Sequence, residues 1–487
     1  MTTTMCEVQL LIGDSDAPAA STATFVRKNP ISGEVATRAA AAGADDAIAA
    51  AEAAAEAYPA WAALGPHERR KRLLHAADLL EARTADFISV MMNEIGATAG
   101  WAGFNVYLAA QMLREAASMT TQVSGEVIPS EIPGSLAFSI RQPVGVVLGI
   151  APWNAPVILG IRAIAMPLAC GNTVVLKASE ICPATHRLIG TVLREAGLGH
   201  GVVNVLTHDA ASASTIVETL IAHRAVRRIN FTGSTRVGKI LAVSAAKHLK
   251  PILLELGGKA PLIILDDADL DAAVDAAAFG AFMNQGQICM STERIIIDEK
   301  VADAFAQKFV AKVKTLPCGD PRKGEVVFGA VVGMPTVDRV RALVKDAESC
   351  GAKVLLSGEA QGTIMPAVIV DHVTPAMQMF REESFGPSVS ITRFNTVEEA
   401  ITLANDTEYG LSAAVFGRDI ARAVEVAKRI DSGMCHVNGP TVHDEAQMPF
   451  GGVKASGYGR FGGKAAVNEF TELRWITIQT APRHYPF

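Results

Sequence analysis

The 487-residue sequence has few charged residues and no long basic segment. Only 19% of its residues are charged, with 44 Lys and Arg against 50 Asp and Glu, and no run of Lys and Arg is long enough to suggest a local exception. Nucleic-acid-binding domains usually carry a clustered basic patch, so we expect no nucleic-acid partner. The 49% apolar fraction excludes a disordered chain. The length predicts two or three domains.

Long hydrophobic runs are also lacking, although the mean hydropathy is positive. The longest uncharged stretch, 143–161, contains Pro152 and Pro156. These prolines would interrupt a membrane-spanning helix and leave its backbone groups unpaired in lipid. The N-terminus has no basic segment and only a short apolar run at 8–12. We therefore expect neither a membrane span nor a secretory signal.

Cysteine is scarce and scattered. The seven cysteines include no C-x-x-C pair, and their number is odd. Both facts disfavour a disulfide framework and a zinc cluster, so we expect no metal and a reducing, cytoplasmic location.

Helices and short apolar runs divide the chain into regions. Residues 44–118 have the periodicity and capping residues of helices, and 121–142 resembles a polar hairpin. Apolar runs then alternate with helix-length segments, which predicts βαβ units and parallel sheets. The predicted strands are 144–150, 173–176, 202–206, 228–231, 252–255, 262–265, 294–297, 354–356, 367–370, 389–392 and 413–416. The predicted helices between them are 155–169, 184–196, 212–223, 235–246, 269–281, 299–315, 335–348 and 418–429.

The alternation predicts two doubly wound α/β domains, with a boundary near Gly257 and Gly258. The segment 474–480 has the composition of a strand but stands alone at the end of the sequence. A partner subunit's sheet edge is one place where such a strand could pair.

One glycine motif is misleading. Residues 457–462 fit the pattern G-x-G-x-x-G, which binds dinucleotides only between a strand and a helix with an acidic residue about 20 positions later. No strand precedes this motif, and position 477 is Thr. We interpret it as a glycine-rich loop.

The segment 231–238 is a better phosphate site. It follows a predicted strand directly and starts a helix with Ser234 at the cap, and Gly233 allows close approach to the backbone. An ordinary Ser-capped turn is the alternative.

Three further segments contain residues suited to catalysis. Cys289 follows an apolar helix among polar Asn and Gln residues, so it is either a nucleophile or an inert core thiol. Glu255 ends an apolar strand, where burial would make it a general base unless it pairs with Lys259 or solvent. Asn154 lies between two prolines, which suits an oxyanion donor or a helix cap.

Taken together, these segments resemble the ordered motifs of the NAD(P)-dependent aldehyde dehydrogenase superfamily. The matching motifs are Pro-Trp-Asn-Ala-Pro at 152–156, Leu-Lys-Ala-Ser-Glu at 176–180, Phe-Thr-Gly-Ser at 231–234, Leu-Glu-Leu-Gly-Gly-Lys at 254–259, Gln-Gly-Gln-Ile-Cys at 285–289, Glu-Glu-Ser-Phe-Gly-Pro at 382–387 and Pro-Phe-Gly-Gly at 449–452. The likeness covers the chain from about residue 25.

The resemblance implies a fold and a mechanism. The fold would have two Rossmann-type domains and a small β oligomerisation arm: 1–120 with 143–255 for NAD binding, 256–445 for catalysis, and 121–142 with 465–487 as the arm. Cys289 would attack the aldehyde, the Asn154 amide and the Cys289 backbone N–H would hold the oxyanion, and Glu255 would activate water to hydrolyse the thioester.

The resemblance also implies how NAD would bind. Ser234 would contact the pyrophosphate, Lys177 and Glu180 the adenosine ribose, and Glu383 the nicotinamide ribose beside Phe385. The remaining expected cofactor contacts are Pro152, Trp153, Ser179, Gly233, Leu256 and Gly257. A carboxylate at Glu180 would repel a 2′-phosphate, so we expect NAD rather than NADP.

The segment 436–450 resembles the aromatic branch of the family, with salicylaldehyde as the expected substrate. The expected substrate contacts are Arg162, Trp101, Tyr107, Ile288 and Phe450. Arg162 could bind a ring hydroxyl, or a carboxylate as in succinic semialdehyde dehydrogenases, or it could pair with an acid and turn away. A non-redox cysteine acyltransferase or amidase is the alternative from another class. The family forms homodimers and homotetramers, and we expect one of these here.

Overall fold

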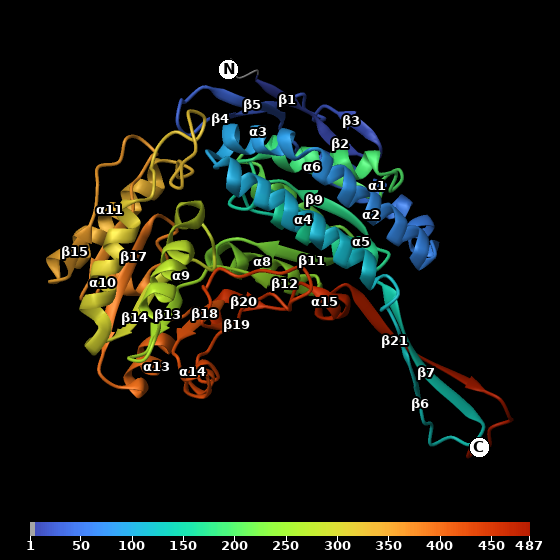
Figure 1. Cartoon of the computed structure of the whole chain (residues 1–487). Coiled ribbons are helices and arrows are strands. Elements are labelled where there is room, and N and C mark those ends of the chain that lie inside the picture. The colour runs from blue at the N-terminus through green and yellow to red at the C-terminus, as the bar shows by residue number, and fades with distance from the viewer. Residues whose placement is uncertain (1–4) are drawn as a thin grey trace.

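The computed structural model describes residues 5–487 and contains two large helix-covered sheets and a projecting arm (Figure 1). The α-helices are α1 (Ala44–Ala63), α2 (Pro66–Ala82), α3 (Thr84–Ile95), α4 (Ala99–Met119), α5 (Pro156–Ala169), α6 (Pro183–Glu195), α7 (Ala213–Ala222), α8 (Thr235–Lys247), α9 (Leu270–Phe282), α10 (Glu299–Lys314), α11 (Met334–Ser349), α12 (Gln378–Arg381), α13 (Val397–Asn405), α14 (Ile420–Ala427) and α15 (Gly463–Glu469). Two 3₁₀ turns, η1 (Met283–Gly286) and η2 (Lys454–Ser456), complete the helical elements.

The first large sheet has eight strands in the order β20-β12-β11-β8-β9-β10-β2-β3. They are β2 (Leu10–Ile12), β3 (Ser15–Ala17), β8 (Val146–Ile150), β9 (Thr173–Lys177), β10 (Val203–Leu206), β11 (Val226–Thr232), β12 (Ile252–Glu255) and β20 (Gly457–Tyr458). The strands from β12 to β10 run parallel, and the edge strands pair antiparallel. Helices α1, α7 and α8 cover one face, and α5 and α6 cover the other. Burial on both faces explains why these strands are continuous apolar runs.

The second large sheet has seven strands in the order β15-β16-β17-β14-β13-β18-β19. They are β13 (Ala260–Ile264), β14 (Thr292–Asp298), β15 (Lys353–Leu356), β16 (Val368–Asp371), β17 (Ser388–Phe394), β18 (Ser412–Phe416) and β19 (Met434–Val437). All pairs are parallel except β15 with β16. Helices α9 and α10 cover one face, and α13 and α14 cover the other. The chain passes from the first sheet to the second between β12 and β13.

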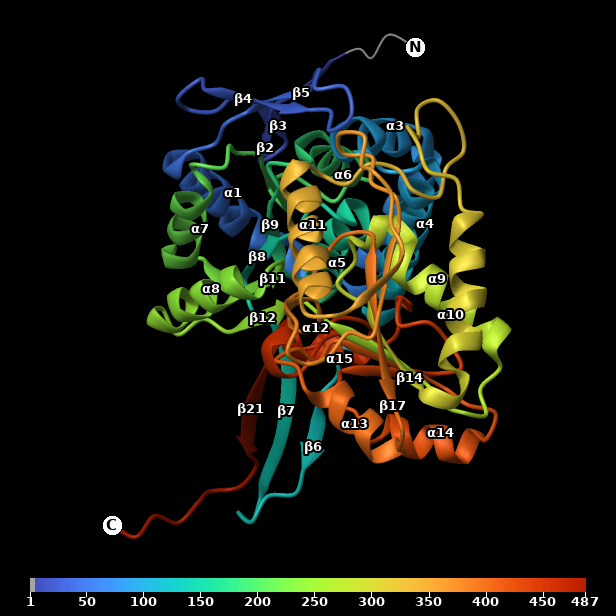
Figure 2. The ribbon, with the colours of Figure 1, turned by 90° about the vertical axis from the view of Figure 1, so that its left-hand side faces the viewer.

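The arm is a three-stranded sheet of β6 (Glu126–Ile128), β7 (Ser135–Pro143) and β21 (Thr471–Gln479) that extends away from the body (Figure 2). Strand β21 pairs antiparallel with β7 along nine residues, from Thr471 opposite Pro143 to Gln479 opposite Ser135. A partner subunit's sheet edge, one candidate for pairing this last strand, is therefore not the edge that it uses. Its partner lies in the same chain, because the hairpin of β6 and β7 leaves one edge of β7 open.

The predicted α/β class is confirmed, and the predicted strands and helices between residues 144 and 429 are found with small shifts at their ends. Helix α3 lies in the predicted helical region 44–118 but was not separated from its neighbours. The unpredicted elements are α12, α13, α15, β2, β3, β19, β20 and a small N-terminal sheet of β1 (Cys6–Val8), β4 (Thr24–Lys28) and β5 (Val35–Ala40). Short or half-exposed elements carry too little periodicity to be recognised. The division of the chain into three roles stays a prediction. These are NAD binding for 1–120 with 143–255, catalysis for 256–445, and the oligomerisation arm for 121–142 with 465–487. Among the described residues, no helix is both long and apolar enough to cross a membrane.

Candidate active site

Cys289 lies in a buried turn where the carboxyl edge of the first sheet meets the amino edge of the second. The turn follows α9 and contains Asn284 and Gln285 at positive φ of 48° and 55°. Non-glycine residues rarely adopt this conformation, and they do so mainly where the surrounding structure holds them. Here Gln285 Nε2 donates to the Ala330 carbonyl (3.1 Å), and Gln287 Oε1 accepts from the Val332 N–H (2.9 Å). The polar residues around Cys289 therefore fix the turn that presents the thiol.

Asn154 follows β8 and is fixed on both its backbone and its side chain. Its carbonyl accepts from Trp101 Nε1 (3.0 Å) and from Asn284 Nδ2 (2.9 Å). Its own Nδ2 donates to the Gln287 carbonyl (2.9 Å). An amide nitrogen carries two hydrogens, so one remains for a second acceptor. The amide is therefore oriented beside Cys289 with a hydrogen to donate.

Glu255 ends β12 and is completely buried. Neither of its carboxyl oxygens has a hydrogen-bond partner within residues 5–487. The alternative that it pairs with Lys259 is excluded, because Lys259 pairs with Glu293 (2.6 Å). Burial raises the pKa of Glu255 to about 7. A carboxyl group with such a pKa exchanges protons readily near neutral pH.

Burial also raises the pKa of the Cys289 thiol well above its ordinary value, and the negative charge of Glu255 adds to this effect. The thiol is consequently protonated at neutral pH and needs a base to become a nucleophile. Glu255 lines the same cavity as Cys289 and is the carboxyl group placed for this task.

Two cavities meet at Cys289. The first, called here the sheet cavity, has a volume of about 430 Å³ and lies at the carboxyl edge of the first sheet. It includes eight of the expected cofactor contacts, namely Pro152, Trp153, Gly233, Ser234, Leu256, Gly257, Glu383 and Phe385. The second, called here the apolar cavity, has a volume of about 190 Å³. Cys289 and Asn154 line both cavities, so molecules in the two would meet at the thiol.

The sheet cavity has the features of a phosphate and ribose site. Gly233 follows β11, and Ser234 caps α8 with its Oγ accepting from the Val237 N–H (3.4 Å). The positive end of α8 therefore borders the cavity. Lys177 ends β9, two strands from β11, and Ser179 and Glu180 follow it. None of the three is among the lining residues of this cavity. They lie further along the same carboxyl edge.

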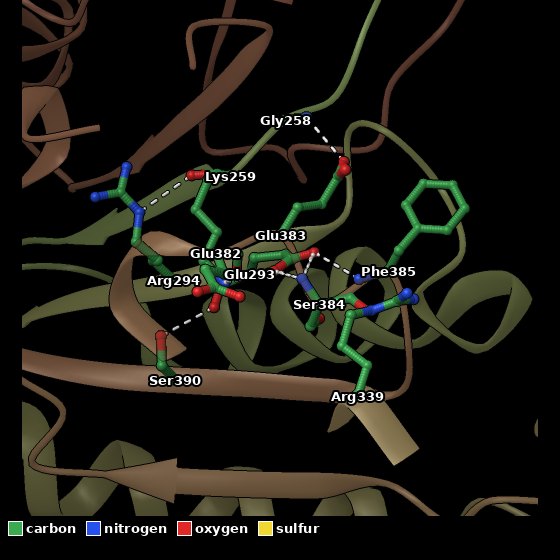
Figure 3. Close-up of polar contacts among 10 residues, drawn as sticks. All are labelled: Gly258, Lys259, Glu293, Arg294, Arg339, Glu382, Glu383, Ser384, Phe385 and Ser390. Carbon is green, nitrogen blue, oxygen red and sulfur yellow. Dashed lines mark hydrogen bonds and ion pairs between the residues drawn. The ribbon is translucent and has the colours of Figure 1, made fainter. Parts of the chain in front are cut away.

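The segment 382–385 reaches the sheet cavity from the second sheet, and Figure 3 shows how it is held. The Glu293 carboxylate accepts from the N–H groups of Ser384 (2.8 Å) and Phe385 (3.1 Å). The Glu383 carboxyl accepts from the Gly258 N–H (2.9 Å), and burial raises its pKa to about 8.

The sequence analysis missed Glu293. This buried residue lies at the start of β14, where its carboxylate forms the ion pair with Lys259 already described. In the sequence, Glu293 is only a charged residue within an apolar strand. The pattern of neighbouring residues does not show which distant groups such a residue binds.

The expected substrate residues divide into two groups. Trp101, Ile288, Phe450 and Arg162 line the apolar cavity. Tyr107 does not, because it is 57% exposed and borders a neighbouring surface cavity instead. Tyr107 is on α4 six residues after Trp101, so the two side chains leave the helix on different faces.

The glycine motif at 457–462 does not bind phosphate in the way of a dinucleotide fingerprint. Its first residues form the edge strand β20, which pairs antiparallel with β12, and no strand leads from it into a parallel βα turn. Gly457 has positive φ, and a Cβ there would lie 2.1 Å from the Leu254 carbonyl oxygen. Close backbone packing explains this glycine. Within residues 5–487, no group of three or more His, Cys, Asp and Glu residues could hold a metal ion.

Two mostly parallel sheets, each covered by helices on both faces, define a doubly wound, Rossmann-type α/β fold. The chain belongs to the aldehyde dehydrogenase family, whose family model matches residues 17–476. It is an aldehyde oxidoreductase.

Relatives of known activity cover nearly the whole chain. A vanillin dehydrogenase of Pseudomonas fluorescens is 62% identical over 482 residues, which are 99% of this chain and 100% of that protein. A salicylaldehyde dehydrogenase of Pseudomonas putida is 52% identical over 482 residues, which are 99% of this chain and 100% of that protein. The crystal structure of a salicylaldehyde dehydrogenase from Pseudomonas putida G7, complexed with salicylaldehyde, has a TM-score of 0.97 at 52% identity and covers 99% of this chain and 100% of its own.

Proposed function

We propose that this protein oxidises an aromatic aldehyde to the carboxylic acid with NAD as the hydride acceptor. The observation that supports this most is the position of Cys289, between a cavity with the features of a dinucleotide site and an apolar cavity. The relatives named for vanillin and for salicylaldehyde add support from sequence. Vanillin and salicylaldehyde are equally good candidate substrates.

The mechanism follows from three side chains. Glu255 takes the thiol proton, and Cys289 Sγ forms a bond to the aldehyde carbon. The second Asn154 amide hydrogen and the Cys289 backbone N–H stabilise the resulting oxyanion. Bound NAD would accept the hydride, which leaves a thioester on Cys289. Glu255 releases the thiol proton to solvent and then takes a proton from a water molecule, whose oxygen attacks the thioester carbon. The C–S bond breaks, the Cys289 sulfur leaves as the thiolate, and the carboxylic acid is released.

The residues present fit an NAD molecule. Gly233 and Ser234 at the start of α8 would take the pyrophosphate, and Glu383 with Phe385 would hold the nicotinamide end. Lys177, Ser179 and Glu180 would take the adenosine ribose, where the Glu180 carboxylate would repel a 2′-phosphate. NAD is therefore the proposed cofactor rather than NADP.

The alternative that Arg162 binds the carboxylate of a semialdehyde has less support. Arg162 forms an ion pair with Asp444, whose side chain lines the same cavity. A substrate carboxylate would face that negative charge. A cysteine acyltransferase or amidase without redox chemistry has no support, because the chain belongs to the aldehyde dehydrogenase family.

We also propose that the arm mediates homodimer or homotetramer formation. Val127, Leu473, Trp475 and Ile478 on its strands are largely exposed in the single chain. Such an exposed apolar group is typical of a surface that another chain covers.

An assay of NADH formation tests the proposed function. The substrates are salicylaldehyde, vanillin, benzaldehyde and succinic semialdehyde, each with NAD and with NADP. We expect the aromatic aldehydes with NAD to have the highest kcat/KM. A strong preference for succinic semialdehyde would contradict the aromatic assignment, and no NADH from any aldehyde would contradict the redox assignment.

We predict that Glu293→Gln weakens NAD binding. Glutamine cannot supply two anionic oxygens to Lys259 and to the Ser384 and Phe385 N–H groups, so the segment that carries Glu383 loses its support. Hydrogen bonds to charged groups contribute about 1.5–3 kcal/mol, so we expect KM for NAD to rise on the order of tenfold or more.

The measurements for Glu293→Gln are initial rates against NAD concentration and thermal unfolding. Glu348→Gln is the matched control, because it makes the same change at an exposed position on α11. A Glu293→Gln variant that lost stability but kept the KM for NAD of the unaltered protein would contradict the positioning role.

A further inference from the structure

The apolar cavity contains one polar pair besides its reacting end. Asn154 and Cys289 form the reacting end, and Arg162 and Asp444 are the charged side chains among the lining residues. The other lining residues are aliphatic or aromatic, such as Ile158 on α5. A charged pair in such surroundings needs an explanation, because burial of charge is unfavourable unless the charge is paired and hydrogen-bonded.

Arg162 is held in place on two sides. It comes from α5, and its guanidinium lies 4.1 Å from the centroid of the Phe450 ring. Its Nη2 donates to Asp444 Oδ2 in an ion pair whose side chains are 6% and 10% exposed. Asp444 therefore neutralises most of the Arg162 charge, and the cavity does not contain an unpaired cation.

Asp444 is only half satisfied. Its Oδ1 is buried and has no hydrogen-bond partner among residues 5–487. A buried acceptor without a donor is destabilising, and most buried polar atoms in proteins have a partner. Because Asp444 lines the apolar cavity, a molecule bound there can supply the missing donor.

We propose that the Arg162–Asp444 pair is a subsite for a hydroxyl group on the aromatic ring of the substrate. The ring hydroxyl donates its proton to Asp444 Oδ1 while the ring packs against the apolar walls. The inference rests on the proposed function, because it needs an aromatic aldehyde in this cavity. A carboxylate on the ring would meet the charge of Asp444, and a methoxy group has no proton to donate. The pair is therefore a specificity determinant for hydroxylated rings.

The first test uses the unaltered protein and needs no variant. We would measure kcat/KM with NAD for benzaldehyde and for the 2-, 3- and 4-hydroxy and methoxy benzaldehydes. We expect at least one hydroxy isomer to exceed both benzaldehyde and its methoxy counterpart by about tenfold or more. The ring position with the largest ratio identifies the carbon that faces Asp444. Similar values for hydroxy and methoxy rings at all three positions would overturn the proposal.

The second test removes the pair. A double variant, Arg162→Met with Asp444→Leu, replaces the ion pair with apolar side chains of similar size, an exchange that proteins often tolerate. We expect the ratio of kcat/KM for the preferred hydroxy isomer over its methoxy counterpart to fall by about tenfold. An unchanged ratio would overturn the proposal.

Glu445→Gln is the matched control. Glu445 neighbours Asp444 but is 44% exposed and pairs with His443 (2.9 Å), outside the apolar cavity. We expect the hydroxy-to-methoxy ratio to keep its value in this variant. If NADH forms from benzaldehyde but the ratios are near one, the subsite is wrong and the proposed function stands. If no aldehyde yields NADH, both are wrong.

Discussion

Replacement of Cys289 by Ala is expected to abolish aldehyde oxidation, with kcat reduced on the order of 10³-fold or more. The proposed reaction has no other group that can form the bond to the aldehyde carbon, and loss of a nucleophile is among the largest effects that a single side chain produces. The turn around Cys289 is held by Gln285 and Gln287, so the fold should survive the loss of one sulfur atom. The measurement is NADH formation under saturating NAD and aldehyde.

The Cys289→Ala result needs proof that the protein is folded and still binds NAD. Binding of NAD, followed by calorimetry, should stay within a few-fold of the unaltered protein. Cys350→Ala is the matched control, because Cys350 is exposed at the end of α11 and far from both cavities. A Cys289→Ala variant that retained activity comparable to the Cys350→Ala variant would refute the covalent mechanism.

Replacement of Glu255 by Gln is expected to slow both halves of the reaction, because the proposed mechanism uses this carboxylate to deprotonate first the thiol and then water. A general base typically contributes 10²–10⁴-fold, so we expect steady-state turnover to fall by about 10²-fold or more. NADH should form slowly from the first turnover onward, without a fast initial release of one equivalent per active site. Rapid mixing with detection of NADH measures this first turnover. A full burst of NADH followed by slow turnover would show that Glu255 acts only in thioester hydrolysis and that another group deprotonates the thiol.

The pKa of Glu255 also predicts how kcat depends on pH. Glu255 accepts a proton only as the carboxylate, and its pKa is about 7 because it is buried. Where hydrolysis limits turnover, kcat should rise with pH up to about 7 and level off above it. Below this pKa, kcat should fall roughly tenfold for each pH unit, because a single group titrates. The Glu255→Gln variant should lack this rise. An unaltered protein whose kcat is constant between pH 6 and 8 would contradict Glu255 as the base in the limiting step.

Much of the fold was predictable because its elements have strong local signals. The strands of the two large sheets are short apolar runs bounded by helix-length segments, and β11 with α8 matches the predicted strand, cap and helix around Ser234. The N-terminal strands β1, β4 and β5 were not predicted, because strands of three to six residues with one exposed side resemble loops in sequence. The C-terminal strand was recognised, but its pairing with β7 could not be chosen from the sequence over a partner subunit's sheet edge.

The residues of the candidate site were also recognised from ordered motifs, but their roles were left open between chemical and structural alternatives. The structure decides some of these alternatives. Glu255 is buried and unpaired among the described residues, whereas Lys259 pairs with Glu293, and Tyr107 is exposed outside the apolar cavity. Their catalytic and cofactor roles remain proposals for the experiments above.

The sequence by itself determined the order of strands and helices, the family and the set of candidate residues, because periodicity, caps and short motifs are properties of neighbouring residues. The tertiary structure alone decided which distant residues meet. Arg162 pairs with Asp444 across 282 positions, and the Asn154 amide donates to a carbonyl 133 positions away. Such contacts depend on how sheets and loops pack in three dimensions, and no local pattern encodes that arrangement. For the same reason the unpaired oxygen of Asp444, and with it the proposed hydroxyl subsite, became visible only in the folded chain.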